Sequence, residues 1–418
     1  MSERVVVTGL GFVTPIGNDR AAVTASLREL RHGLKSVAWF PDCPVTVAGT
    51  IAGFALEDLN QAGWTWPTGY EIPRETLRAL PPHGVYAFCA VEQALRESGL
   101  ARVALGDGGT GLFCASAGSP RYLVHHLGEL AAAGGERGHP WGVVRSIAGT
   151  LNFNLAAHYG VRGAVAGFSS ACAASGQALA YAHDEIALGR HARMIVVGAE
   201  EPTWESLLPF IGMRALSRQR DPALASRPFD AQRDGFIGAG GAVAVVLESE
   251  ATARARGAPV IAEFAGWGQS ADGHSVAQSE PDGRGLEVAM RRALAAAGAA
   301  PGDIDYVNAH ATSTPVGDRA EARALLRVFG AGGPPVSSTK ALTGHPLSMS
   351  SALEFALCCV ALQEQFVPGQ AHLGEVEAEF AALNLPRATQ AAPLRTVVSN
   401  SSGFGGSNVA LVLRAAQS

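Results

Sequence analysis

The feature that most constrains the fold of this chain is a series of short apolar runs that end at glycine or at a polar turn. Runs rich in valine and isoleucine occur at 4–11 (RVVVTGLG), 192–201 (ARMIVVGAEE), 241–249 (GAVAVVLES), 305–313 (DYVNAHATS) and 394–406 (LRTVVSNSSGFGG). Continuous apolar runs of this length are typical of strands that are buried on both faces of a sheet. Helical stretches lie between them, and two of these, at 176–189 and 321–330, end at a glycine of the C-cap kind. Alternating strands and helices predict an α/β layered fold.

The size and composition of the chain fit an enzyme with a large core. Its 418 residues allow either two domains or one large α/β unit. Hydrophobic residues make up 47% of the chain and charged residues 17%, which is typical of a well-buried globular protein. The formal net charge of -5 argues against a surface that binds nucleic acid or anionic lipid as a whole, although it allows a local basic patch. We therefore expect no nucleic-acid partner and no membrane partner.

The cysteines and the N-terminus both indicate a cytoplasmic protein. The six cysteines show no CxxC spacing and no paired framework, which favours reduced thiols over a disulfide scaffold or a zinc ribbon. The opening MSERVVVTGLG has no basic n-region, no long apolar core and no cleavage site, so we expect no signal peptide. We also expect no apolar run of transmembrane length.

One cysteine stands in an unusual setting. Cys172 lies in FSSACAASG (168–176), where small residues surround the thiol and a predicted helix follows it. At the N-terminal end of a helix, unpaired N–H groups and the helix dipole favour a thiolate, which is a strong nucleophile for acyl groups. For a lone cysteine, an inert buried thiol is the commoner outcome.

Two histidines occupy positions where α/β sheets gather their sites. His310 follows a predicted strand in VNAHATSTPVGD, and His345 precedes a predicted helix start at Pro346 in SSTKALTGHPLS. Small or hydroxylated residues flank both of them instead of an apolar face. Two satisfied structural histidines remain the commoner reading of such a pair, and spacing in the sequence alone cannot bring them to Cys172.

Two segments of the chain echo each other. SSACAASGQALAYAHDEIAL (169–188) and TGHPLSMSSALEFALCCVAL (343–362) both place a reactive residue ahead of small residues and an apolar helix. The echo suggests a duplicated α/β unit with a boundary near 248–260. We predict an N-terminal half, 1–255, that carries Cys172 and a C-terminal half, 256–418, that carries His310 and His345.

Longer motifs in a fixed order are more specific than any single residue. SSACAAS, RPFDAQRDGFIGAGG, NAHATSTPVGD, STKALTGH and NSSGFGGSN follow one another along the chain. In these motifs the chain resembles the β-ketoacyl-ACP synthases, the condensing enzymes of fatty acid and polyketide synthesis, and it looks closest to the synthase I/II type. The resemblance implies the five-layered αβαβα thiolase-like fold, built from two duplicated halves, and an acyltransferase that needs no cofactor beyond the phosphopantetheine of the acyl carrier protein.

The resemblance also implies roles for individual residues. Cys172 matches the nucleophile that takes an acyl group from acyl carrier protein (ACP). His310 and His345 match the histidines that promote decarboxylation of malonyl-ACP, whose carbanion then attacks the acyl-Cys172 thioester to give 3-oxoacyl-ACP. An oxyanion hole is implied at the backbone N–H groups of Cys172 and Phe404. The further site residues implied by the resemblance are the buried pair Lys340 and Glu354, the glycines Gly403 and Gly405, and the phosphopantetheine contacts Thr312 and Thr314.

The resemblance implies protein partners as well. An acidic acyl carrier protein should dock on a basic patch, for which Arg74, Arg78 and Arg145 are the candidates. Members of the family are usually dimers, so we expect a homodimer or a heterodimer with a subunit like a chain-length factor.

The chain departs from the family pattern at two places, PLSMSS (Pro346–Ser351) after His345 and Ser402 before GFGG. Both border the expected site, so the pocket and its gating are open questions. The alternatives are a non-catalytic chain-length partner subunit, a thiolase-like enzyme that acts on CoA esters, and a cysteine hydrolase with a Cys–His pair. The presence of Cys172, His310 and His345 together argues against the first of these.

Overall fold

The computed structural model describes residues 3–416, and one mixed ten-stranded sheet runs through it. Its order is β10-β9-β13-β14-β8-β1-β7-β6-β4-β5. The strands of the first half are β1 (Val5–Val13), β4 (Thr110–Ala115), β5 (Val165–Phe168), β6 (Arg193–Glu200) and β7 (Gly241–Ser249). Those of the second half are β8 (Ala262–Ala271), β9 (Tyr306–Asn308), β10 (Val336–Ser337), β13 (Thr396–Gly403) and β14 (Ser407–Ala415).

The two halves of the sheet repeat one topology. From the centre outwards the orders are β1-β7-β6-β4-β5 and β8-β14-β13-β9-β10, so each half places its first, fifth, fourth, second and third strands in the same sequence. In each half the outer strands are parallel and the inner ones antiparallel. The halves meet where β1 pairs with β8, with Val5 opposite Phe264 and Val7 opposite Ala262. This repeat matches the duplication suggested by the sequence, while the residue boundary at 255/256 stays a prediction.

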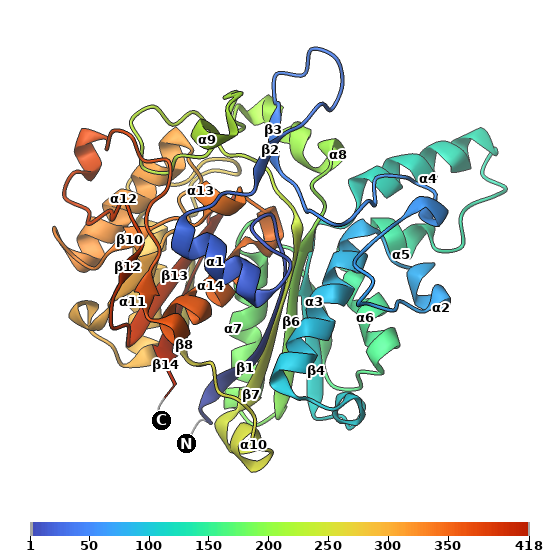
Figure 1. Cartoon of the computed structure of the whole chain (residues 1–418), viewed down its shortest axis with the longest axis horizontal. Coiled ribbons are helices and arrows are strands. Elements are labelled where there is room, and N and C mark those ends of the chain that lie inside the picture. Colours follow the sequence, from blue (N-terminus) through green and yellow to red (C-terminus); the bar gives the residue numbers. More distant parts are fainter. Residues whose placement is uncertain (1–2, 417–418) are drawn as a thin grey trace.

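Helices divide the molecule into five layers, which follow one another from left to right in Figure 1. The helices α7 (Ala174–Ala187) and α14 (Ser350–Glu364) form the central layer. The outer layers contain α3 (Pro82–Ser98) beside the first half and α11 (Arg284–Ala297) beside the second. Strand β7 shows why the layers form, because alternate side chains of its apolar run join the central core or the core under α3. The predicted thiolase-like fold is therefore confirmed.

The remaining elements connect and flank these layers. The other helices are α1 (Arg20–Glu29), α2 (Arg74–Leu77), α4 (Pro120–Ala132), α5 (Gly142–Ser146), α6 (Leu151–Tyr159), α8 (Trp204–Leu207), α9 (Pro222–Ala225), α10 (Glu250–Ala255), α12 (Pro315–Phe329) and α13 (Lys340–Thr343). Two small sheets pair β2 (Leu34–Ser36) with β3 (Val47–Gly49) and β11 (Phe366–Val367) with β12 (Gln390–Ala391).

The expectation that no apolar segment reaches transmembrane length needs a correction. Leu347–Glu364 is an 18-residue helical segment with a mean hydropathy of 1.2, which is long and apolar enough to cross a membrane. Of this segment, 89% is buried inside the structure, between the two halves of the sheet. Packing in the central layer therefore accounts for its composition, as for other core helices.

Candidate active site

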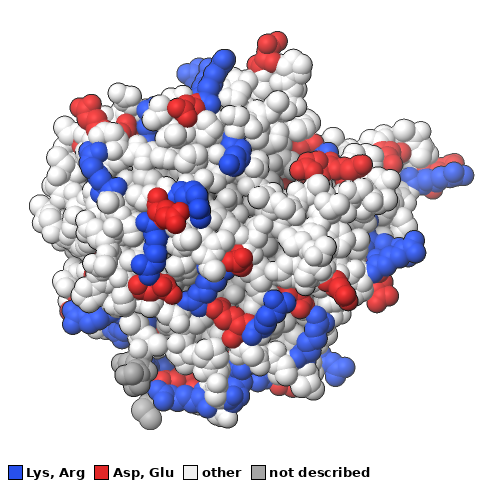
Figure 2. Space-filling view, viewed as in Figure 1, with Lys and Arg blue, Asp and Glu red and all other residues white. Residues whose placement is uncertain are grey.

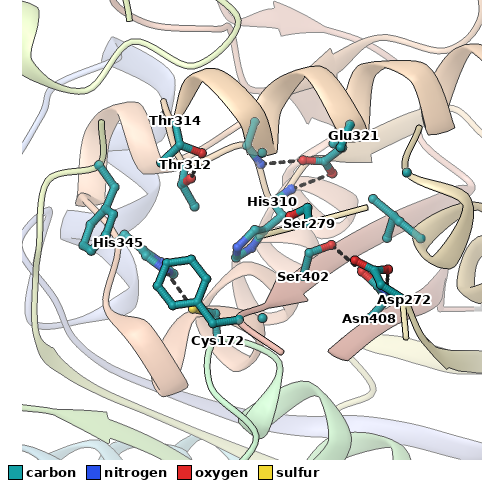
Figure 3. Close-up of a pocket in the computed structure, with 18 of the residues that line it drawn as sticks. Cys172, Asp272, Ser279, His310, Thr312, Thr314, Glu321, His345, Ser402 and Asn408 are labelled. Carbon is teal, nitrogen blue, oxygen red and sulfur yellow. Dashed lines mark hydrogen bonds between the residues drawn. The ribbon is translucent and has the colours of Figure 1, made fainter. Parts of the chain in front are cut away.

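Three side chains from distant parts of the chain meet at one end of the central helices. Cys172 lies just before α7, His310 follows β9, and His345 lies just before α14. The Cys172 Sγ and His345 Nε2 are 3.0 Å apart, and ligand-type atoms of all three residues lie within 4.8 Å of one another. The imidazole rings of His310 and His345 meet edge to face, with centroids 5.3 Å apart. Figure 3 shows both rings directed toward the sulfur.

The small residues around Cys172 allow a close approach of backbone. The preceding residue, Ala171, has a φ of 49°, a left-handed conformation that is rare outside glycine and that turns the chain sharply into α7. A Cβ at Gly403 would lie 3.2 Å from the backbone nitrogen of Cys172, a tight contact that any other residue could make only if its neighbours shifted. The backbone N–H of the next residue, Phe404, is directed at the Cys172 sulfur. Two backbone N–H groups are thus gathered beside the thiol.

Burial governs the protonation of the site. It raises the pKa of the Cys172 thiol to about 12, although the charge of Lys340 and the Phe404 N–H act in the opposite direction. The pKa values of His310 and His345 lie well below the usual histidine range because burial, and then the positive charge of Lys340, disfavour a second proton. The expected helix-stabilised thiolate is therefore not the resting form at neutral pH. A neutral thiol faces neutral imidazoles.

A buried carboxylate fixes the loop that carries His310. The sequence pattern predicts a strand over 305–313, but β9 ends at Asn308 and the chain leaves the sheet there. Glu321 on α12 accepts hydrogen bonds from the backbone N–H of His310 at 2.9 Å and of Ala311 at 2.6 Å. Burial raises the pKa of Glu321 to about 7. Sequence reasoning missed Glu321. Its only signal in the sequence is that an acidic residue falls on the apolar face of a predicted helix, where it would be buried.

The predicted Lys340 and Glu354 form a fully buried ion pair beneath the histidines. Burial raises the pKa of Glu354 to about 7 despite the opposing charge of Lys340. Ser401 donates a hydrogen bond to the other carboxylate oxygen at 3.5 Å. A buried ammonium without this partner would be costly, so the pair holds a positive charge near the site at a fixed place.

The site opens into a cavity of about 60 Å³. Thr312 and Thr314 line it with hydroxyls 3.1 Å apart, and Gly403 and Phe404 line it as well. Gly405 has a φ of 83° and makes the turn after Phe404, and it does not line the cavity. The unusual Ser402 also lines the cavity, where its hydroxyl donates to Asn408 at 2.8 Å. Asn408 in turn donates to Asp272 at 2.6 Å, a polar wall that sequence reasoning did not predict.

The three arginines named as carrier contacts differ in exposure. Arg74 and Arg78 are exposed at α2. Arg145 is only 7% exposed, and its guanidinium donates to the Arg78 carbonyl at 2.8 Å and to Gln61 at 2.6 Å. Its proposed role as a surface contact is therefore wrong, because internal hydrogen bonds occupy the side chain. On the face shown in Figure 2, basic and acidic side chains are interspersed and no continuous basic surface is seen.

The ligand types of this site could also hold a metal ion. A thiolate and two imidazoles are common zinc ligands, and among residues 3–416 Cys172, His310 and His345 are the one group with suitable spacing. All six cysteines are free and buried in the structure.

Comparison with known proteins assigns the chain to a family. Residues 2–253 match the model of the β-ketoacyl synthase N-terminal domain, and residues 261–374 match the model of its C-terminal domain. The chain belongs to the β-ketoacyl synthase family. It is 36% identical to 3-oxoacyl-[acyl-carrier-protein] synthase 1 of Escherichia coli (strain K12) over 99% of both chains. It has a TM-score of 0.91 and 32% identity to a β-ketoacyl synthase from Burkholderia phymatum STM815, covering 99% of this chain and 100% of that one.

These relatives define the activity of the chain, which is that of a 3-oxoacyl-ACP synthase, an acyltransferase of fatty acid or polyketide biosynthesis. Homologous ketosynthases are found in complexes. The ishigamide ketosynthase/chain length factor has a TM-score of 0.88 and 28% identity to this chain, with 100% of both chains covered. A ketosynthase in complex with a type II polyketide acyl-carrier protein has a TM-score of 0.85 and 26% identity, again over 100% of both chains.

Proposed function

We propose that Cys172 carries the acyl group during condensation and that His310 and His345 bind the thioester oxygen of the malonyl group. The observation that carries this proposal is the meeting of one thiol and two neutral imidazoles, with 3.0 Å between Cys172 Sγ and His345 Nε2. Neutral imidazoles can donate hydrogen bonds without placing a permanent charge in the buried site.

In the first half-reaction, the Cys172 sulfur attacks the thioester carbon of acyl-ACP. A C–S bond to Cys172 forms, the C–S bond to the phosphopantetheine breaks, and the thiol proton ends on the departing sulfur. Negative charge develops on the carbonyl oxygen during the attack. The backbone N–H groups of Cys172 and Phe404 are the proposed donors to that oxygen, and loss of one such donor costs roughly a hundredfold to a thousandfold in rate.

In the second half-reaction, malonyl-ACP loses CO₂ and the electron pair of the broken C–C bond forms an enolate. His310 and His345 donate hydrogen bonds to the enolate oxygen, and Lys340 adds a fixed positive charge. The carbanion then attacks the acyl-Cys172 carbonyl, a C–C bond forms and the C–S bond to Cys172 breaks. Cys172 regains a proton from solvent, and 3-oxoacyl-ACP leaves. Thr312 and Thr314 hold the phosphopantetheine arm, which the carrier itself supplies.

Two partners follow from this proposal. Arg74 and Arg78 offer an exposed basic pair for the acidic carrier.

The helix α4 and the sheet edge β5 support the second partner, which is another copy of this chain in a homodimer or a subunit like a chain-length factor in a heterodimer. Val124 and Leu127 on α4 are 65% and 56% exposed, and the outward-facing Val165 lies on the last strand of the sheet. Exposed apolar side chains and an open sheet edge each favour pairing with another chain. A cytoplasmic location stays a prediction.

The test is intact-mass measurement of the enzyme after exposure to a panel of acyl-ACPs, followed by radiolabelled malonyl-ACP. We expect one acyl group on Cys172 and conversion to 3-oxoacyl-ACP, and the panel also reports which chains the pocket accepts around Ser402. Release of free acid instead of product would indicate a hydrolase. An unloaded protein that gains activity only with a second subunit would indicate a partner subunit, and loading from CoA esters alone would indicate a thiolase-like enzyme.

A further inference from the structure

The serine-rich start of α14 touches the site at a point that the reaction scheme leaves unexplained. The Ser350 hydroxyl lies 2.9 Å from Nδ1 of His345, on the side of the ring opposite Cys172. The Ser350 residue is completely buried. The inference that follows rests on the proposed role of His345, which makes the position of its single ring proton important.

The neighbouring serines are engaged elsewhere, so the contact is specific to Ser350. Ser348 donates its hydroxyl to the carboxylate of Glu200, and Ser351 donates to the backbone carbonyl of Cys172 at 3.0 Å. Between His345 and these serines, Leu347 has a φ of 44°, a left-handed conformation that is unusual for a bulky residue. This sharp turn carries the first turn of α14 back over the imidazole.

The direction of the Ser350 hydrogen bond follows from the partners that each group has. Within residues 3–416, His345 Nδ1 is the only hydrogen-bonding partner of the Ser350 hydroxyl. If Nδ1–H donated to Ser350, the buried hydroxyl proton would have no acceptor, and an unpaired buried donor is unfavourable. If Ser350 donates instead, its proton is satisfied. A ring whose Nδ1 accepts this hydrogen bond carries its proton on the other nitrogen, Nε2.

We propose that Ser350 is a positioning residue that donates a hydrogen bond to His345 Nδ1 and thereby keeps the ring proton on Nε2. The Nε2–H then faces the Cys172 sulfur, with 3.0 Å between Nε2 and Sγ. It also faces the place where the thioester oxygen gains negative charge as the enolate forms. A ring in the other tautomer would present a lone pair to that developing negative charge and would repel it. The partner of the second ring nitrogen thus decides whether a histidine donates or accepts, as an orienting group does in other enzymes.

The first test is the tautomer itself, read from the ¹⁵N spectrum of enzyme labelled at histidine, with His345→Ala to assign the signals. In the wild-type enzyme we expect His345 to be neutral and protonated at Nε2. In Ser350→Ala we expect a mixture of tautomers or a shift of the proton to Nδ1. A wild-type proton on Nδ1, or an unchanged Ser350→Ala spectrum, would overturn the proposal whatever the activity of the enzyme.

The second test is kinetic. Loss of one hydrogen bond to the ring is expected to lower kcat for malonyl-ACP decarboxylation about tenfold in Ser350→Ala, with KM unchanged. Ser350→Thr keeps the hydroxyl and should restore most of the rate. The matched control is Ser98→Ala in α3, an equally buried serine whose hydroxyl donates to the Leu95 carbonyl far from the site. A Ser350→Ala enzyme with full kcat would contradict the proposal, while a fully active His345→Ala enzyme would instead contradict the proposed function.

Discussion

The segments that lead into α7 and α14 occupy equivalent places in the two halves, yet they carry different residues. Each follows the third strand of its half, β5 or β10, and each opens a helix of the central layer. The first segment surrounds Cys172 with alanine, serine and glycine, whereas the second continues from His345 into Pro346–Ser351. The same position in the fold therefore supplies a thiol from one half and an imidazole from the other.

The contacts between the two helix starts explain the difference. Ser175 of the first segment accepts a hydrogen bond from the Ala352 N–H at 2.9 Å, which satisfies an unpaired donor in the first turn of α14. Ser351 of the second segment donates back to the Cys172 carbonyl. A Cβ at Gly176 would lie 2.9 Å from the Ser351 Cβ, so the first segment has to stay small where the second carries side chains. Small residues around the thiol are thus a packing requirement of the opposite half.

If the two segments serve different half-reactions, mutations in them should separate those half-reactions. In our proposal the first half supplies acyl transfer through Cys172, and the second supplies decarboxylation through His310 and His345. The predictions below test that division and then the contacts that join the two segments, from the largest expected effect to the smallest.

The largest effect is expected from the reactive residues themselves. Cys172→Ala should lower condensation at least about a thousandfold because no sulfur remains to carry the acyl group. It should still release CO₂ from malonyl-ACP, because both histidines remain. His310→Ala and His345→Ala should show the reverse, with decarboxylation lowered roughly a hundredfold to a thousandfold and acyl loading lowered much less.

Release of labelled CO₂ and the intact mass after acyl loading measure the two steps separately. Cys89→Ala, a buried cysteine of α3 outside the cavity, is the control for removal of a thiol. A Cys172→Ala enzyme that condenses at the wild-type rate would disprove the nucleophile. Normal CO₂ release by both histidine variants would disprove the division between the halves.

A smaller effect is expected from filling the space between the helix starts. In Gly176→Ala the new Cβ would meet Val409 Cγ1 at 2.6 Å as well as Ser351, so we expect a loss of up to about 3 kcal/mol in the free energy of unfolding. Urea denaturation measures it. Gly128→Ala in α4, where nothing lies within 4 Å of the new methyl, should gain up to about 1 kcal/mol. Equal stability of the two variants would show that the helix starts have room to separate.

The burial of Glu200, which accepts the hydroxyl of Ser348, should appear as a pH dependence of stability. Burial raises the pKa of Glu200 to about 7, so the folded protein holds this proton more tightly than the unfolded chain does. Its contribution is fully present below the ordinary glutamate pKa and is lost as the pH rises through about 7. Glu200→Gln should therefore gain stability relative to the wild type between pH 5 and pH 8, by roughly 2 kcal/mol.

Denaturation curves across that pH range give the comparison, with the exposed Glu136→Gln as the matched control. A constant difference between Glu200→Gln and the wild type at all pH values would mean that Glu200 does not titrate as its burial requires.

The smallest effect is expected from Ser175→Ala, which removes the acceptor for the Ala352 N–H. Loss of a helix-capping side chain costs about 1 kcal/mol. The change should be visible in urea denaturation and as faster hydrogen exchange of the Ala352 amide, with α3 as the internal reference. Unchanged exchange at Ala352 would show that the cap from the opposite segment is not needed.

The sequence could predict much of the fold because the apolar strand runs and the glycine stops are local signals. The strand at 305–313 was predicted too long, since its letters do not show that the chain leaves the sheet at Asn308 to be held by Glu321. The join between the halves through β1 and β8 also could not be predicted, because pairing of distant strands has no local signal.

In the site, too, some features could be predicted from the sequence and others could not. The residues Cys172, His310 and His345 could be named from motifs, but 173 residues separate the first from the last, so only the fold brings them together. The helix start favours a thiolate at Cys172, but burial outweighs this influence and raises the pKa of the thiol. The burial of Arg145 could not be predicted, because the sequence does not show that its guanidinium donates hydrogen bonds to Gln61 and to the Arg78 carbonyl.

The interlocked helix starts have a consequence for the order in which the protein is made. During translation, the ribosome adds Cys172 first and reaches His345 only 173 residues later. Ser351, which donates a hydrogen bond to the Cys172 carbonyl, follows after that. The first half can therefore collapse early, as N-terminal segments do, but it emerges without the imidazole that faces its sulfur. The thiol stays chemically unassisted on the nascent chain until the second half has been synthesised and closes over it.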